Sequence, residues 1–268
     1  MTARPVWRAG LVLAAAAVVA FDGCAARRLA LPQGAGQGFP EFRAAFDEAT
    51  GACRAVTSLT AEAGVSGRVG GQKLRGRVLA GFSRPDRLRL EGLAPFGPPA
   101  FILVSSGGEA TLLLPRDPAV LRGEPPEAII EALVGLPLSP ATLQAVIAGC
   151  GLPVSDPVAG VSYGGGWARV EGGRGAATYL RQDDGGRWIV QAAVDGSLRV
   201  EYERRVEGAV REIRLSLEGD QPRTELRLKV TEVDLAVALG DEAFAVKVPR
   251  DAVAITLPEL RRAGPLGR

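Results

Sequence analysis

Short segments in which apolar and charged residues alternate recur along most of this sequence, and they restrict its fold more than any other feature. They occur between Ala61 and Leu121 and again between Trp167 and Val230, separated by glycine-containing turns such as Gly70–Gly71. A period of two is typical of strands with one buried and one solvated face. Tight glycine turns join antiparallel neighbours. The chain is therefore predicted to be mainly antiparallel β, with the sheet ending in the segment AFAVKVP.

Two of these predicted strands differ in pattern and are joined by an apolar loop. Leu88 and Leu90 alternate with charged residues, whereas Phe101 and Leu103 belong to the unbroken apolar run AFILV. Such a run is typical of a strand that is covered on both sides or that lines an apolar cavity.

The loop between these strands, from residue 92 to 99, lacks the polar residues that hairpin loops normally carry. It presents Leu93, Pro95 and Phe96 instead. One interpretation is that Phe96 folds back onto its own sheet, because single apolar residues in loops need no functional explanation. The other, in which Phe96 projects outward, depends on a family resemblance described below.

Three segments have helical periodicity. The first, residues 39–60, has an apolar face that includes Phe46 and a polar face without a row of lysines, so we expect it to pack on the sheet rather than on a bilayer. The second, PPEAIIEALVGLPL, opens with proline and acid and places Ile130 and Leu133 on one side. The third, LSPATLQAVIAGC, has Ser139 as its predicted cap. A further short helix is expected after residue 257.

The N-terminal segment predicts export. Basic residues precede the apolar stretch AGLVLAAAAVVA, as in a signal peptide, which we place at residues 1–23. The sequence FDGC resembles a bacterial lipobox, so Cys24 is the predicted lipidation site and residues 24–38 a lipidated tether. Because Ala25 rather than aspartate follows, resemblance to enterobacterial sorting favours the outer membrane, facing the periplasm. The alternative is an ordinary secretory signal with an unrelated cysteine.

Composition argues against several classes of function. A net charge of +2 gives no reason to expect nucleic-acid binding, and the absence of histidine removes the commonest general base and transition-metal ligand. Residues 160–164 form a G-x-S-x-G string, but without histidine Ser162 has no triad base. We therefore predict a protein that is not an enzyme, with no catalytic residue, no metal site and no cofactor.

The order of these segments resembles the LolB family of outer-membrane lipoproteins. In that family a strand leads into an N-P-L-G loop, here DRLRLEGLAPFG, and a helix pair around a G-x-P-[IL] turn follows, here EALVGLPLSPATLQAVIAG. The resemblance covers residues 50–150. It implies an unclosed, LolA/LolB-like half-barrel over residues 39–250 whose short helices plug an apolar cavity for acyl chains, followed by a C-terminal tail over residues 251–268.

The resemblance also implies a function and its residues. Family members accept lipidated cargo from the periplasmic carrier LolA and insert it into the outer membrane, and their protruding leucine falls on Phe96, beside Leu93 and Pro95. We expect the chain to act as a monomer on acyl chains of lipoproteins or lipids. The alternative is an envelope lipoprotein that uses the same fold as a lipid sensor or scaffold without transport. The expected cavity lining is Leu88, Leu90, Phe101, Leu103, Ile130 and Leu133.

The two remaining cysteines are predicted to form a disulfide. Cys53 and Cys150 both lie in the exported part of the chain, where thiols tend to oxidise. Each lies on or beside a helix that the resemblance places inside the same half-barrel.

Overall fold

One large antiparallel sheet dominates the computed structural model, which describes residues 28–154, 156–219 and 224–264. The described residues from Leu31 to Gly264 form a single compact unit, and Arg28 to Ala30 before it form neither helix nor strand. Residues 1–23 and Cys24, the predicted signal peptide and lipidation site, lie outside the described residues. The strands are β1 Gln37–Gly38, β2 Ser58–Val69, β3 Gln72–Ser83, β4 Arg87–Leu93, β5 Phe101–Ser106, β6 Glu109–Leu114, β7 Ala119–Glu124, β8 Ala159–Tyr163, β9 Trp167–Glu171, β10 Ala177–Gln182, β11 Trp188–Asp195, β12 Leu198–Val206, β13 Ala209–Leu217, β14 Glu225–Leu235 and β15 Val253–Ala254.

The strand order shows how the sheet is assembled from two runs of hairpins. It is β1-β8-β9-β10-β11-β12-β13-β14-β2-β3-β4-β5-β6-β7-β15, so strands from the two halves of the sequence meet where β14 pairs with β2. All neighbours are antiparallel except β15, which runs parallel to β7. Within the described residues β1 and β15 form the two edges, so the sheet is unclosed, as predicted.

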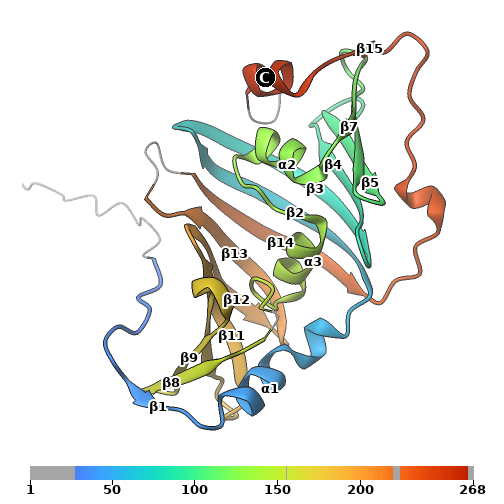
Figure 1. The fold of residues 1–268 in the computed structure, drawn as a ribbon. Coiled ribbons are helices and arrows are strands. Elements are labelled where there is room, and N and C mark those ends of the chain that lie inside the picture. The colour runs from blue at the N-terminus through green and yellow to red at the C-terminus, as the bar shows by residue number, and fades with distance from the viewer. Residues whose placement is uncertain (1–27, 155, 220–223, 265–268) are drawn as a thin grey trace, which may run out of the picture. The chain divides into compact units, whose positions relative to one another are not determined.

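The helices follow one another across one face of this sheet (Figure 1). They are α1 Phe42–Arg54, α2 Pro126–Val134, α3 Pro140–Ala148 and α4 Leu257–Ala263, with 3-10 turns η1 Gly173–Gly175 and η2 Asp241–Phe244. α1 packs against β8 to β11, α3 against β2 and β13, and α2 against β6. The core lies between the helices and the strands, because inward residues of the strands alternate with exposed ones.

Local sequence rules explain several of these boundaries. Ser139 caps α3 by accepting the N–H of Thr142, and Gly149 ends the helix with a positive φ of 93°. Gly70 and Gly71 form the two-residue turn between β2 and β3, both with positive φ, as the twist of a tight hairpin requires. Leu74 and Phe82 of β3 are buried in the core.

Other predicted boundaries were wrong. The first helix ends at Arg54, and the rest of the predicted helix leads into β2 at Ser58, because Leu59 and Thr60 pair with both β14 and β3. The predicted tether, residues 24–38, ends in β1, whose Gln37 and Gly38 pair with β8. Ser162 of the G-x-S-x-G string lies in β8.

The C-terminal boundary also differs from the prediction. The segment AFAVKVP forms no strand beyond η2, and its Phe244 is buried against the outer face of the sheet. The expected tail supplies β15, which was not predicted, and the short helix expected after residue 257 forms as α4, which buries Leu257 and Leu260. α4 packs on α2. Residues up to Gly264 therefore belong to the folded unit, because η2 contacts β4 and β5, β15 pairs with β7, and α4 packs on α2.

Candidate functional site

An apolar cavity lies between the inner face of the sheet and the helices α2 and α3. Its volume is about 90 Å³, and its lining is almost entirely hydrocarbon. Small inward residues of β2 and β3, Ala61, Ala63 and Ala80, face the larger residues of the helices across this space. The cavity exists because these alanines leave volume that a leucine at the same position would fill.

The structure brings four of the six predicted cavity residues to this lining. Leu90 of β4 and Phe101 of β5 lie on the sheet side, and Ile130 and Leu133 lie on α2. The other two predicted residues are fully buried in the core without reaching the cavity; they are Leu88 and Leu103. Both still point inward, but the surrounding core covers them, which sequence periodicity does not distinguish from a cavity wall.

Sequence reasoning missed most of the cavity wall, although part of the signal was present. The strands β13 and β14 contribute Leu215, Leu226 and Val230 from the far half of the chain. Ala61 and Ala63 alternate with polar residues at inward positions of a long strand, and consecutive small inward residues are a readable sign of space above a sheet. No local pattern, however, indicates which distant strands close the wall.

The backbone approaches the cavity closely at one glycine. Gly92 pairs with Phe101 across β4 and β5, and a Cβ at Gly92 would lie 2.3 Å from the Phe101 ring. Only glycine leaves room for that ring. Gly92 therefore fixes how Phe101 lies against the cavity.

The apolar loop after β4 presents Phe96 to solvent. The Phe96 side chain is 87% exposed, which excludes the interpretation in which it packs on its own sheet. Arg116, in the turn between β6 and β7, donates to the carbonyl oxygens of Phe96 at 2.7 Å and Pro98 at 3.4 Å. Sequence reasoning missed this contact because Arg116 lies about twenty residues away. The loop is thus held by its backbone while the aromatic ring remains free.

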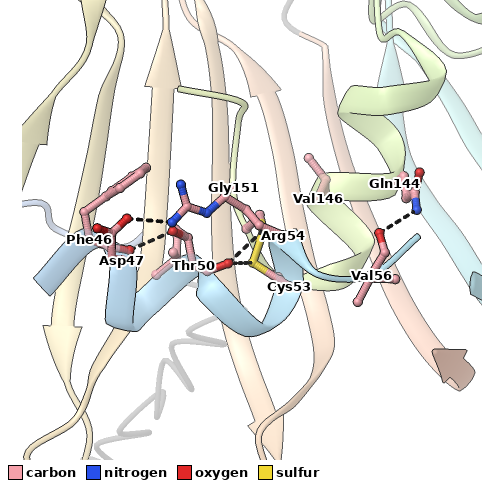
Figure 2. The surroundings of a disulfide bond; sticks show 12 residues. Phe46, Asp47, Thr50, Cys53, Arg54, Val56, Gln144, Val146 and Gly151 are labelled. Atoms are coloured by element: carbon pink, nitrogen blue, oxygen red, sulfur yellow. Dashed lines mark hydrogen bonds and ion pairs between the residues drawn. A yellow bond between two sulfur atoms is a disulfide. The ribbon is translucent and has the colours of Figure 1, made fainter. Parts of the chain in front are cut away.

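A disulfide joins Cys53 of α1 to Cys150, just after α3 (Figure 2). The two Cα atoms are 5.6 Å apart, and 97 positions separate the residues in the sequence. This is the pair predicted from the sequence. Nearby, Gln144 of α3 donates to the carbonyl oxygen of Val56 at 3.3 Å, so α3 is tied to the chain around α1 at more than one point.

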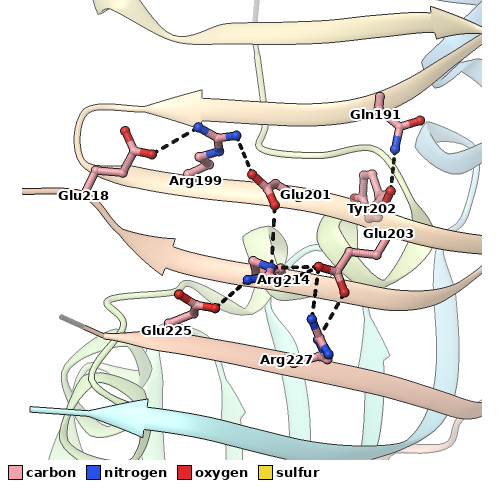
Figure 3. A network of polar contacts seen from close by, with 9 residues as sticks. All are labelled: Gln191, Arg199, Glu201, Tyr202, Glu203, Arg214, Glu218, Glu225 and Arg227. Atoms are coloured by element: carbon pink, nitrogen blue, oxygen red, sulfur yellow. Dashed lines mark hydrogen bonds and ion pairs between the residues drawn. The ribbon is translucent and has the colours of Figure 1, made fainter. Parts of the chain in front are cut away.

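A charged cluster lies on the outer face of β12 to β14, and its central residues Glu201 and Arg214 are buried. Figure 3 shows Arg214 among Glu201, Glu203 and Glu225; its contacts to the last two are 2.5 and 2.6 Å. Glu201 is 2% exposed and also pairs with Arg199. Burial disfavours the charged Arg214, but the carboxylates of Glu203, Glu225 and Glu201 outweigh it and raise its pKa. The positive and negative charges of these side chains balance one another, so the cluster is a structural link between the strands.

No protein-family model and no curated protein matches the sequence. Among the described residues, none of the helices has the length and apolar character needed to cross a membrane.

Several solved structures are similar in fold. A DUF1329 family protein from Desulfovibrio piger is 15% identical, covering 76% of this chain and 96% of its own, with a TM-score of 0.48. A LolA superfamily protein from Nitrosomonas europaea is 11% identical, with coverages of 76% and 95% and a TM-score of 0.46. An outer-membrane lipoprotein-sorting protein domain from Vibrio parahaemolyticus is 8% identical, with coverages of 76% and 93% and a TM-score of 0.43. At these values the likeness assigns neither a family nor a function.

Proposed function

We propose that the protein is an envelope lipoprotein that binds acyl chains in the cavity beneath α2 and α3 and transfers lipidated cargo to a membrane. In this proposal Cys24 anchors the chain in the outer membrane facing the periplasm, and a LolA-like periplasmic carrier supplies the cargo to a monomer. The observation that carries the proposal is an apolar cavity under helices, together with an exposed aromatic residue on the neighbouring loop.

The cavity suits a hydrocarbon chain rather than a polar ligand. Its walls offer no charged or hydrogen-bonding side chain, so apolar burial would supply the affinity. One water-sized sphere needs about 10–15 Å³ by a comparable measure, so a cavity of about 90 Å³ holds only a short stretch of an acyl chain. Binding of a whole chain then requires that α2 or α3 move away from the sheet.

Filling the cavity tests the binding step. Ala63→Leu adds three carbon atoms to the wall and should weaken binding of a fluorescent fatty acid by about tenfold or more, because burial of a methylene is worth about 0.8 kcal/mol and about two would be displaced. Ala44→Leu, at an exposed position of α1, should bind as the wild type does. Equal affinity of all three proteins, with melting temperatures that show each is folded, would contradict cavity binding.

Charge on the loop tests the delivery step. Phe96→Glu should block transfer of a lipidated cargo from a soluble carrier into liposomes, because a carboxylate opposes entry into the bilayer interface. Stability should change by no more than about 0.5 kcal/mol, since the side chain is exposed. Fatty-acid binding should also remain. If delivery were unchanged while binding persisted, the alternative of a lipid sensor or scaffold without transport would be favoured.

A further inference from the structure

A hollow with basic walls lies directly beside the Phe96 loop, on the outer face of the sheet. It is open, with a volume of about 900 Å³, and its rim includes Leu93 and Pro95 of the loop. The cations Arg75 and Arg77 of β3 and Lys229 of β14 line it, and all three are exposed. The apolar Phe96 loop and a group of cations therefore lie on one surface.

Strand register explains why the hollow forms there. Gly64 of β2 lies between Arg77 of β3 and Lys229 of β14 in the paired strands, and Ser66 lies beside Arg75. Side chains that face each other across neighbouring strands point to the same side of the sheet. Because Gly64 and Ser66 are small, the long basic side chains surround a floor that is close to the backbone.

Two of these cations have no acidic partner among the residues that the structure describes. Arg77 pairs with Glu62 at 2.8 Å, whereas Arg75 and Lys229 make no ion pair there. Two residues from Lys229 on β14, by contrast, Arg227 contacts Glu203 at 3.1 Å. The positive charge at the hollow is therefore available to an external anion.

Basic and acidic side chains also lie at different ends of the strands on this face. A second hollow on the same outer face, under the segment that leads into η2, is lined by the carboxylates Glu62, Glu91, Glu232 and Asp234, with Arg89 as its only cation. The Phe96 loop joins the basic end of β3 rather than this acidic end. A negatively charged membrane surface would thus be attracted at the loop and repelled at the opposite end.

We propose that the Phe96 loop and the basic hollow, Arg75, Arg77 and Lys229, form one membrane-docking surface that takes the phosphates of anionic phospholipids while Phe96 enters the interface. This inference rests on the proposed function, because it assumes that the loop meets a bilayer. It adds that the bilayer carries anionic phospholipids. Apolar insertion of one aromatic residue is weak, and basic residues near an anionic surface add affinity and orientation.

Vesicle sedimentation tests this surface in the full chain carrying Cys24→Ala, so that no acyl anchor contributes. We expect stronger binding to vesicles that contain phosphatidylglycerol than to vesicles of phosphatidylcholine alone, and a decline of the difference with added salt. Arg75→Gln with Lys229→Gln should lower binding to the anionic vesicles by about 25-fold, since each cation near the surface contributes about fivefold. Binding to phosphatidylcholine should not change.

A charge-matched control separates the hollow from net charge. Arg43→Gln with Arg181→Gln removes two exposed cations of α1 and β10, away from the hollow, and should leave binding to both kinds of vesicle unchanged. An equal loss in this control, or equal wild-type binding to both vesicles, would overturn the inference while loop insertion stood. Failure of the wild type to bind either vesicle would instead count against the proposed membrane role of the loop.

Discussion

Tyr202 joins α3 to the sheet through a hydroxyl group that is both donor and acceptor. Its O–H donates to the carbonyl oxygen of Val146 at 2.9 Å, and its oxygen accepts the N–H of Gly151 at 2.7 Å. The side chain is 2% exposed. Removing the hydroxyl leaves two buried backbone groups without this partner, and each such loss costs about 1–3 kcal/mol.

The first prediction is that Tyr202→Phe lowers the free energy of unfolding by about 2 kcal/mol or more, measured by urea denaturation at neutral pH. A second expectation concerns the pH dependence of the wild type. Burial raises the pKa of the Tyr202 phenol in the folded protein. An unfolded tyrosine loses its proton near pH 10. Stability of the wild type should therefore fall as the pH rises above about 10, because only the unfolded chain releases this proton there.

The same variant supplies the control for the pH dependence. Tyr202→Phe cannot titrate at this position, so its stability should fall less steeply than that of the wild type between pH 10 and 11. If the two proteins lost stability in parallel over that interval, Tyr202 would not be the group that resists deprotonation.

At the scale of elements, α4 shows how a buried apolar side chain contributes more to stability than an exposed ion pair. Leu260 is 4% exposed in the core, whereas Arg261 next to it makes an exposed ion pair with Glu131 of α2 at 3.2 Å. Leu260→Ala should cost about 2–5 kcal/mol of unfolding free energy, the range for buried leucines. Arg261→Ala should cost less than about 1 kcal/mol.

Denaturation curves of these two adjacent alanine variants measure the contribution of α4 to the unit. Both substitutions favour the helix equally, so propensity does not explain a difference between them. Similar and small losses would mean that α4 rests loosely on α2 and that the predicted C-terminal tail was the better description.

Elements defined by local chemistry could be predicted from the sequence, and elements defined by distant partners could not. The cap of α3 at Ser139 and the Gly70–Gly71 turn follow from residues within a few positions. The strand β15 exists only because Val253 and Ala254 reach β7 after a long excursion. Two residues carry too little periodicity to indicate a strand.

The candidate site divides in the same way. Phe101, Ile130 and Leu133 are apolar in a periodic pattern, and the structure places them at the cavity. The same pattern marked Leu103, which the core covers. The period of the apolar residues along a strand or helix determines the face on which a side chain lies. The size of the residues that face it across the core determines whether space remains there.

At the scale of the whole folded unit, the two helices over the cavity are attached with unequal strength. The C-terminal end of α3 is held by the Cys53–Cys150 disulfide and by Tyr202. Arg205 adds a hydrogen bond to the carbonyl oxygen of Gly149 at 3.4 Å. α2 has no such covalent attachment within the described residues, and its outer side is covered by α4, near the end of the chain.

The last prediction is that α2 and α4, rather than the end of α3, move when an acyl chain enters. The cavity is too small for a whole chain, so one wall must yield, and the wall with the weaker attachments should open at the lower free energy. In hydrogen exchange followed by mass spectrometry, saturating fatty acid should speed exchange in residues 126–134 and 257–263. Exchange in residues 146–151 should stay slow. Ala63→Leu, in which the cavity is filled, should show no such change, and faster exchange at residues 146–151 in the wild type would place the opening at α3 instead.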